Sequence, residues 1–486
     1  MHSENDRVET LATGIKGFDT MMGGGIPAGR IILVTGSAGT GKTVLLNEFL
    51  YRGITSCDQN GVFVTFEETP SDIMKNVGNF GWDYRRMQEE GKLSFVDCSP
   101  DARSTEEIST DYDLAPLLLR IKEAIRKTGA DRIVIDSIST LFTQFSSEGA
   151  VRNIIYRICD ELKKQGITGM LSAEQPAGGN TLSRYGVEEF VADGVIQLKL
   201  EAGEQAMTRS MCPIKMRGMG YRSGTVQFTV DSEGLRVYPK IAATTEHART
   251  SFDNKKSIGI PGLDRMLGGG IPQGHMILMS GNTGSGKTLT CMQYLRKGIT
   301  DGEKGIYVAL EEAVPQLKKT AQEHGWDFEE REKEGNLTFI TVDLIDIFPD
   351  KLLAEIVEAV KRTGAKRVVL DSISSIMSAN MNTEKVRQFL IQLTSYLKSE
   401  GVTCMFTYLM SDNFGAGQGQ LLGSLQTNVM RLSSIVDGVI LLQYVEREKK
   451  VGKLLTVLKM RGCNHSRDIV PFEIETGGLR IEREDN

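Results

Sequence analysis

No apolar run in the sequence approaches the roughly 18–20 residues that a helix needs to cross a lipid bilayer. The longest apolar runs have the length of a β-strand, as around Val439–Leu442. The segment from Met1 to Gly14 is polar and lacks the basic and then apolar pattern of a secretory signal. These absences exclude a helical membrane protein, so we expect a cytoplasmic protein with no membrane partner.

Cysteine is scarce, and its spacing excludes the usual cysteine-based sites. The seven cysteines are an odd number, and no two of them form a Cys-x-x-Cys pair. A disulfide framework typically has an even number of cysteines, and a zinc site typically has Cys-x-x-Cys pairs, so neither is supported. We therefore expect reduced thiols, as in the cytoplasm.

Positive charge is not in excess either. Lysine and arginine number 57 and aspartate and glutamate 63, which gives 57 − 63 = −6. A dedicated DNA coat protein would carry a strong positive field, so this balance disfavours that class but leaves room for a local basic groove. Proline is sparse (12 residues) and glycine abundant (52), which is typical of regular elements joined by glycine loops.

The chain is a tandem duplication, and we predict two homologous domains, 1–246 and 247–486. The offset between the halves changes along the chain, so each half carries an insertion, one between Asp97 and Arg132 and one near residues 411–424. The seam, residues 239–256, lacks apolar periodicity and is predicted to be a linker. The matching segments are 13–43 with 258–288, 61–68 with 305–312, 132–139 with 367–374, and 215–218 with 459–462.

Within each half, short apolar runs alternate with helical patterns, which predicts an α/β fold with a mostly parallel sheet flanked by helices. The runs read as strands buried on both faces. Apolar spacing predicts helices over 113–129 and 383–401, ended by Gly129 and Gly401. The predicted strands of the first half include 30–36, 61–66, 132–137 and 194–200.

Both halves carry a phosphate-loop motif between an apolar strand and a helix, which predicts ATP and Mg²⁺ as cofactors. Glycines let backbone N–H groups wrap the phosphates, lysine reaches the β- and γ-phosphates, and threonine ligates Mg²⁺. A merely tight turn would not need the lysine and the threonine. The predicted nucleotide-binding residues of the two loops are Gly36, Gly39, Thr40, Gly41, Lys42, Thr43, Val44, Gly281, Thr283, Gly284, Ser285, Gly286, Lys287, Thr288 and Leu289.

Carboxylates follow the strands beside each loop. Asp136 and Asp371 end strands at the carboxyl edge of the sheet, where they can hold the magnesium shell together with Thr43 and Thr288. The alternative role is a helix N-cap shared with the following serine.

A pair of glutamates recurs at the end of another strand in each half. Adjacent side chains on a strand point opposite ways, so we expect one member to align or deprotonate a nucleophile and the other to differ in role. A solvated turn is the alternative. The catalytic candidates are Glu67, Glu68, Glu311 and Glu312, and Glu311 is also a candidate metal ligand.

The segment Lys-Met-Arg lies far downstream in each half. Alternation places its two cations on one strand face and its methionine on the other, which suits polyphosphate and a charge-stabilising finger. A surface salt-bridge stripe is the alternative. The candidates are Lys215, Met216 and Arg217, and Lys459, Met460 and Arg461.

At these residues the sequence resembles the circadian-clock KaiC family of RecA-like ATPases, from about Leu11 to Ile481. Besides the phosphate loops, the specific segments are FVTFEETP, SRYGVEEFV, VILLQYVE and KMRG. The resemblance implies two tandem RecA-like domains in a two-tiered homohexamer, with ATP held between protomers and the Lys-Met-Arg cations reaching across the interface. The further nucleotide contacts it implies are Asn79, Tyr221 (where the family often has histidine), His324, Lys453, His465 and Arg467.

The resemblance also implies distinct roles for the halves. The first domain would be a slow ATPase that drives assembly, and the second also an autokinase that phosphorylates Ser433 and Ser434. A plain strand opening is the alternative for these serines. The family's extended C-terminal tail, which recruits an activating clock partner, is not found in the 486 − 461 = 25 residues after Arg461. A simpler timer or signalling ATPase is therefore an alternative to a full oscillator, and a KaiB-like protein is a candidate partner.

Two other functions use the same ATPase parts. A RecA-like recombinase or helicase would need a nucleic-acid groove, but the glycine-rich insert Phe414–Gly423 contains no lysine or arginine, and no DNA-binding module precedes Leu11. We therefore expect no nucleic-acid partner. A nucleotide-clamped scaffold with negligible turnover is the third option.

Overall fold

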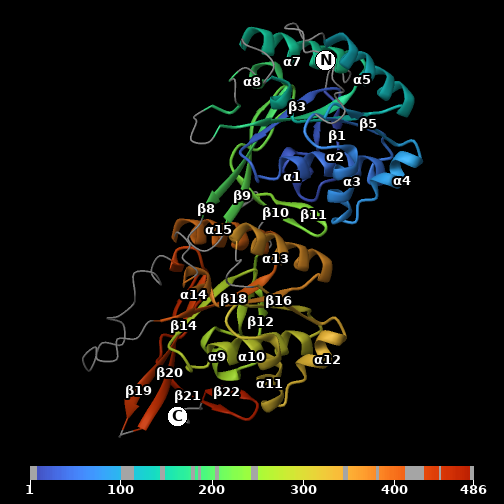
Figure 1. The fold of residues 1–486 in the computed structure, drawn as a ribbon. Helices are drawn as coiled ribbons and strands as arrows, with labels where there is room; N and C mark the ends of the chain where they lie inside the picture. Colours follow the sequence, from blue (N-terminus) through green and yellow to red (C-terminus); the bar gives the residue numbers. More distant parts are fainter. Residues whose placement is uncertain are drawn as a thin grey trace, which may run out of the picture. The chain divides into compact units, whose positions relative to one another are not determined.

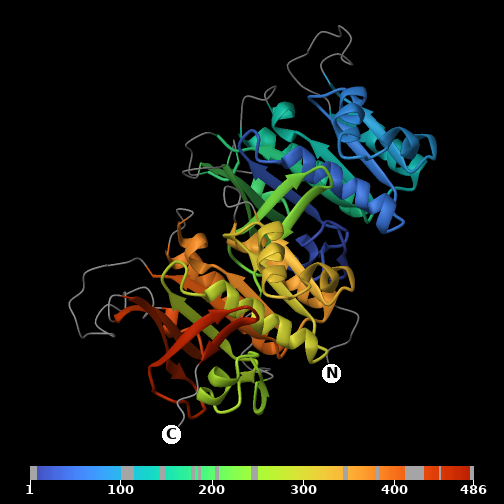
Figure 2. The same ribbon diagram turned by 90° about the horizontal axis from the view of Figure 1, so that it is seen from below.

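The chain divides into two compact units, Met1–Lys240 and Ile241–Asn486, each an α/β sandwich (Figures 1 and 2). Much of the first predicted insertion, and all of the second with Phe414–Gly423, lie outside the described residues. The computed structural model describes residues 8–99, 114–142, 148–176, 181–183, 186, 188–202, 207–241, 250–342, 348–378, 383–410, 432–447 and 450–481.

The first unit contains a nine-stranded sheet in the order β11-β10-β9-β8-β3-β7-β6-β4-β5. The strands from β8 to β5 in this order are parallel, and β9 to β11 extend the sheet in antiparallel fashion. The strands are β3 (Ile31–Gly36), β4 (Gly61–Thr65), β5 (Leu93–Asp97), β6 (Arg132–Asp136), β7 (Thr168–Glu174), β8 (Gly194–Ala202), β9 (Met207–Met216), β10 (Val226–Asp231) and β11 (Gly234–Tyr238).

The second unit repeats this arrangement with nine strands in the order β16-β15-β17-β18-β14-β19-β20-β21-β22. Its strands are β14 (Met276–Gly281), β15 (Gly305–Ala309), β16 (Leu337–Thr341), β17 (Arg367–Asp371), β18 (Thr403–Leu409), β19 (Gly438–Arg447), β20 (Lys450–Met460), β21 (Val470–Glu475) and β22 (Gly478–Ile481). The predicted α/β class and mostly parallel sheets are confirmed.

Helices cover both faces of each sheet, and the predicted helices at 113–129 and 383–401 are confirmed as α5 and α15. Among the described residues, no helix has the length and apolarity that crossing a membrane requires. The helices of the first unit are α1 (Phe18–Met22), α2 (Lys42–Ser56), α3 (Pro70–Gly78), α4 (Tyr84–Glu89), α5 (Leu114–Thr128), α6 (Ile138–Phe142), α7 (Glu148–Lys164) and α8 (Glu188–Val191). Those of the second are α9 (Pro261–Met266), α10 (Lys287–Thr300), α11 (Val314–Glu323), α12 (Phe328–Lys333), α13 (Pro349–Thr363), α14 (Ile373–Ser378) and α15 (Thr383–Ser399).

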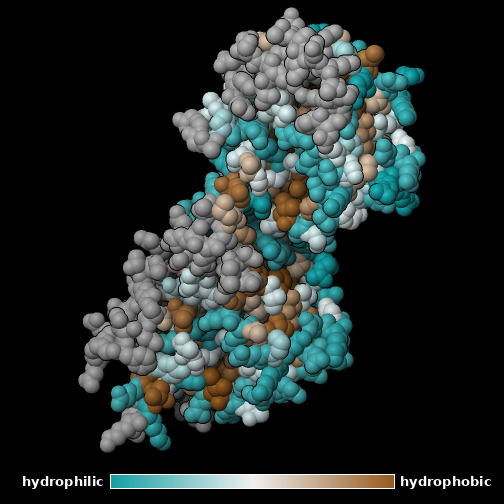
Figure 3. All heavy atoms as spheres, in the orientation of Figure 1, coloured by the Kyte–Doolittle hydropathy of each residue, from teal (hydrophilic) through white to brown (hydrophobic). Residues whose placement is uncertain are grey.

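The central strands are buried on both faces, which explains their unbroken apolar sequences. In β3, Ile32 and Val34 pack in the core layer that also contains α2 and α3. Ile31 and Leu33 point the other way, into the layer of α5 and α7. Hydrophilic side chains cover most of the described surface on the face drawn in Figure 3.

The prediction of a linker over 239–256 is wrong for its last six residues. They form β12 (Ser251–Lys256), which pairs with β13 (Ile271–Gln273), as β1 (Thr10–Leu11) pairs with β2 (Ile26–Pro27) in the first unit. The strand is held by backbone pairing, and most of its side chains are exposed or half-buried. It therefore leaves no apolar period in the sequence.

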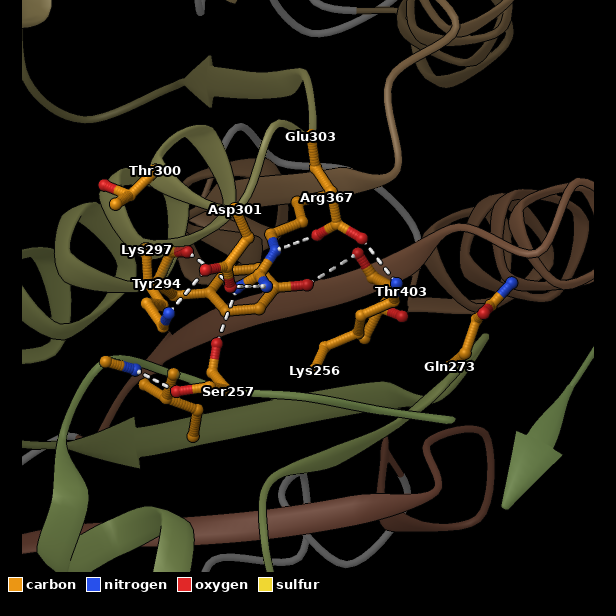
Figure 4. A network of polar contacts seen from close by, with 12 residues as sticks. Lys256, Ser257, Gln273, Tyr294, Lys297, Thr300, Asp301, Glu303, Arg367 and Thr403 are labelled. Atoms are coloured by element: carbon orange, nitrogen blue, oxygen red, sulfur yellow. Dashed lines mark hydrogen bonds and ion pairs between the residues drawn. The ribbon is translucent and has the colours of Figure 1, made fainter. Parts of the chain in front are cut away.

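A fully buried arginine links sheet and helix in each unit. In the second unit Arg367 on β17 donates to Glu303 Oε2 at 2.7 Å and to the carbonyl oxygens of Ser257 (2.6 Å) and Tyr294 (2.9 Å), as Figure 4 shows. In the first unit Arg132 donates to the amide oxygen of Gln59 at 2.7 Å. The second unit thus pairs its buried charge with a carboxylate where the first has a neutral amide.

Candidate functional site

Strand register brings the chemistry-bearing residues of each unit to one edge of the sheet. The strands β3, β4 and β6 are parallel, so their carboxyl ends meet at the same edge, where ligands bind in α/β folds. Thr65 lies opposite Asp136 in the first unit, and Ala309 lies opposite Asp371 in the second. The phosphate loop, the aspartate and the glutamate pair of one unit therefore converge.

Each phosphate loop joins its strand to the start of a helix through glycines that no other residue could replace without strain. Gly41 and Gly286 precede α2 and α10 with φ of +101° and +105°. A Cβ on Gly36 would lie 2.6 Å from the carbonyl oxygen of Leu198. The loop thus keeps its backbone N–H groups close to a helix N-terminus, an arrangement suited to phosphate.

The loop lysines fold over their own loops. Lys42 Nζ donates to the carbonyl oxygens of Gly36 (2.8 Å) and Ser37 (3.0 Å), and Lys287 does the same to Gly281 (2.9 Å) and Asn282 (2.8 Å). Burial lowers the pKa of Lys42, while Glu174, Asp136 and Glu67 oppose that shift. Each ammonium group is therefore held against the carbonyl oxygens at the start of its own loop.

The loop threonine and the strand-end aspartate meet directly. In the second unit Thr288 Oγ1 donates to Asp371 Oδ2 at 2.8 Å. In the first unit burial raises the pKa of Asp136, and hydrogen bonds from Ser172 and Thr43 oppose that rise. Ser372 Oγ accepts from the backbone N–H of Ser375 at 3.3 Å, so the serine rather than the aspartate caps the following turn. A hydroxyl and a carboxylate are hard oxygen donors that fit Mg²⁺.

The two glutamates of the first pair have different partners. Glu67 Oε1 accepts from Ser137 Oγ (2.8 Å) and Thr140 Oγ1 (2.5 Å) at the start of α6. Glu68 Oε2 accepts from Asn76 Nδ2 on α3 at 2.8 Å, and burial raises the pKa of Glu68. Glu67 is therefore held by hydroxyls that follow the Asp136 strand, whereas Glu68 is held by α3.

The second unit differs at the corresponding residues. The hydroxyls of Ser372 and Ser375 bond to each other at 2.9 Å. These serines align with Ser137 and Thr140, which hold Glu67 in the first unit. Burial raises the pKa of Glu312, and the nearby Asp371 and Glu311 raise it further.

The strands β9 and β20 end at the methionines of the two Lys-Met-Arg segments, and the arginines follow directly. The methionines are buried, the lysines half-buried and the arginines exposed. Lys215 Nζ donates to the carbonyl oxygens of Glu189 (2.9 Å) and Ala192 (2.8 Å). Lys459 Nζ donates to those of Ser433 and Val436. Burial lowers the pKa of both lysines, and the neighbouring arginine adds to the shift.

The arginines reach the same segment. Arg461 donates to the carbonyl oxygen of Ser434 at 3.0 Å, and Arg217 to that of Phe190 at 3.3 Å. The Lys-Met-Arg cations of the second unit therefore hold the backbone of the two serines singled out from the sequence. Ser433 is half-buried and Ser434 exposed.

A family model described as "ATPase: KaiC" matches the chain twice, at residues 11–242 and 256–486. The chain belongs to the KaiC family of ATPases. It is 36% identical over 479 residues to "Circadian clock protein KaiC3" of Synechocystis sp., covering 98% of this chain and 92% of that protein. It is also 36% identical over 481 residues to "Circadian clock oscillator protein KaiC" of Synechococcus elongatus, covering 99% and 90%.

The remaining nucleotide contacts expected from the KaiC resemblance lie away from the phosphate loop in the sequence of their own unit. Asn79 ends α3, and Tyr221 donates to the carbonyl oxygen of Ile214 at 2.8 Å. His324 ends α11, with its Nδ1 3.0 Å from the carbonyl oxygen of Glu475. The other three are Lys453 on β20, and His465 and Arg467 between β20 and β21.

Sequence reasoning missed the buried partners of the strand-end aspartates. Tyr307 donates to Asp371 Oδ2 at 2.6 Å, Thr407 donates to Oδ1, and Ser172 donates to Asp136. Burial raises the pKa of Tyr307 well above its ordinary value, so its hydroxyl stays a donor. The alternation of β15 could have indicated Tyr307, because it shares a strand face with Ala309, opposite Asp371.

Proposed function

We propose that this KaiC-family ATPase is a homohexameric ring that binds and hydrolyses ATP in both units and autophosphorylates Ser433, Ser434 or both in the second. It acts as a cytoplasmic timer, clock or signalling ATPase, with a KaiB-like protein as a candidate partner. The observation that carries the proposal is a duplicated site whose phosphate loop, strand-end aspartate and glutamate share one sheet edge, while the first unit has no serine at the positions aligned with Ser433 and Ser434.

The chain's own residues divide the work of ATP hydrolysis. The loop N–H groups and Lys42 or Lys287 hold the phosphates, and Glu67 or Glu311 takes a proton from the attacking water. Thr43 with Asp136, and Thr288 with Asp371, would hold Mg²⁺, which when bound neutralises phosphate charge. Glu311 is a further candidate ligand of Mg²⁺.

The Lys-Met-Arg cations support a site completed by a neighbouring protomer. Arg217 is in the wall of a hollow of about 590 Å³ that also includes Tyr156 on α7 and Phe190 on α8. Tyr156 and Phe190 are 60% and 63% exposed. Large apolar side chains left in contact with water beside a cation suit a face covered by another subunit.

The serine pair supports an autokinase in the second unit. At the offset of 437 − 193 = 244, Ser433 aligns with Glu189 and Ser434 with Phe190, so the first unit has no hydroxyl there. In the transfer, the serine oxygen attacks the γ-phosphorus, its proton passes to Glu311, and ADP leaves. A phosphoryl group would add a charge of about −1.5 to −2 beside Lys459 and Arg461.

The catalytic assignment is tested by replacing each glutamate with its neutral isostere. Glu67→Gln and Glu311→Gln should each spare ATP binding and slow turnover at their own site by roughly 10²–10⁴-fold, because basicity is lost while shape remains. Phosphate release should therefore persist in part in each single variant and collapse in the double variant. Near-wild-type phosphate release in the double variant would show that neither glutamate is the base.

A further inference from the structure

We infer that Tyr307 is a positioning residue for the magnesium site of the second unit, with no counterpart in the first. The inference rests on the nucleotide site proposed above and adds a residue that sets how tightly one of the two sites holds its cation. Two observations support it. The buried hydroxyl of Tyr307 donates to Asp371, and Phe63 occupies the aligned position of the first unit.

The hydroxyl of Tyr307 fixes the orientation of Asp371. Tyr307 is 1% exposed, and its oxygen lies 2.6 Å from Asp371 Oδ2. Thr288 donates to the same oxygen at 2.8 Å, while Thr407 donates to Oδ1. With donors on both oxygens and from three elements, the carboxylate has no freedom to rotate about its last bond without losing a buried hydrogen bond.

The first unit has the same slot without the hydroxyl. Position 307 − 244 = 63 is Phe63, which is fully buried. Phe63 packs against Phe95 with ring centroids 5.7 Å apart, and Tyr307 against Phe339 at 5.9 Å. The two rings therefore occupy equivalent environments, and the hydroxyl is the chemical difference between them.

A donor in this position acts on the metal through the ligand. Removing a partner that orients a ligating side chain typically lowers metal affinity by about 10–100-fold. Among the described residues, loss of the Tyr307 hydroxyl leaves Thr288 as the donor to Oδ2, and in the proposed site this threonine also faces the cation. We therefore expect the lower end of that range, about tenfold.

The test measures Mn²⁺ affinity in the presence of a non-hydrolysable ATP analogue, by electron paramagnetic resonance on the full chain. Asp136→Asn in every sample removes the cation site of the first unit. In that background Tyr307→Phe should raise the Kd for Mn²⁺ about tenfold. Binding of the analogue without metal should not change, because the ring and the phosphate loop are intact.

Tyr294→Phe is the matched control. It deletes an equally buried tyrosine hydroxyl, which donates to the carbonyl oxygen of Thr403 at 3.1 Å, away from Asp371. It should leave Mn²⁺ affinity unchanged. An unchanged Kd in folded Tyr307→Phe, or an equal rise in Tyr294→Phe, would overturn the inference. Since neither readout needs turnover, a failure of the ATPase proposal would be seen separately.

Discussion

At the scale of single residues, the two halves differ in the partner of a buried arginine. Arg367 has Glu303 as its partner, whereas Arg132 has Gln59 at the aligned position. Burial by itself would raise the pKa of Glu303, but hydrogen bonds from Lys256 and Arg367 outweigh it and hold that pKa below its usual range. The carboxylate therefore stabilises the second unit in a pH-dependent way.

The sign of this pH dependence follows from the lowered pKa. The stabilisation is fully present above the unfolded-state pKa of about 4.3 and is lost as pH falls through the folded-state value. Glu303→Gln should lower the free energy of unfolding of the second unit by about 1–3 kcal/mol at pH 7, and the loss should shrink below pH 4. Gln59→Glu is the reciprocal variant and should stabilise the first unit near pH 7. Thermal melts that show an equal loss at pH 7 and pH 3 would contradict this assignment.

The residues of the two sites were predictable to different degrees. That the phosphate loops, Asp136, Asp371 and the glutamates lie at one edge of each sheet follows from motif and strand position, and their roles there remain our proposal. The contacts of Tyr307 and Thr407 with Asp371 were not predicted, because aromatic residues and threonine are common in any buried strand. These contacts depend on which strands are neighbours in the sheet, and the local sequence does not predict strand order.

At the scale of elements, strands and helices with strong periodicity were predictable. The apolar stripe of α5 and the unbroken burial of β3 follow from period 3.6 and from burial on two faces. The strand β12 was missed because backbone pairing with β13 forms it while its side chains stay largely in contact with water.

Close packing between α10 and β17 gives a prediction for an element. A Cβ on Gly298 would lie 2.3 Å from Cδ and 2.4 Å from Nε of the buried Arg367. Gly298→Ala should therefore destabilise the second unit by about 1–3 kcal/mol, since Arg367 can move only by giving up its hydrogen bonds. Its melting temperature should fall by about 2–4 °C per kcal/mol.

Gly78→Ala in α3 is the control for this substitution. Apart from its chain neighbours and the backbone of its own helix, no described atom lies within 4 Å of the Cβ that it would add, so it should be neutral or slightly stabilising. A melting temperature of Gly298→Ala equal to that of the wild type would show that Arg367 can move aside without a loss of stability.

At the scale of the whole molecule, the duplication could be read from the sequence, and the KaiC family accounts for both copies. The division of labour between the copies is our proposal. If the first unit drives assembly, ATP bound there stabilises the ring by mass action, because nucleotide held between subunits binds only the assembled state. Lys42→Ala should then weaken hexamer formation in ATP more than Lys287→Ala does. Sedimentation that finds the hexamer intact in Lys42→Ala and lost in Lys287→Ala would reverse the roles.

The most direct test of the central claim is the intact mass of the chain after incubation with Mg-ATP, followed by peptide mapping of residues 432–445. We predict the mass of one or two phosphoryl groups on Ser433, Ser434 or both. The added mass should persist in Glu67→Gln and be absent in Glu311→Gln, because Glu311 belongs to the unit that carries Ser433 and Ser434, and the first unit has no hydroxyl at the aligned positions. No phosphate on this peptide, or equal labelling after both serines are replaced by alanine, would contradict the autokinase and leave an ATPase alone.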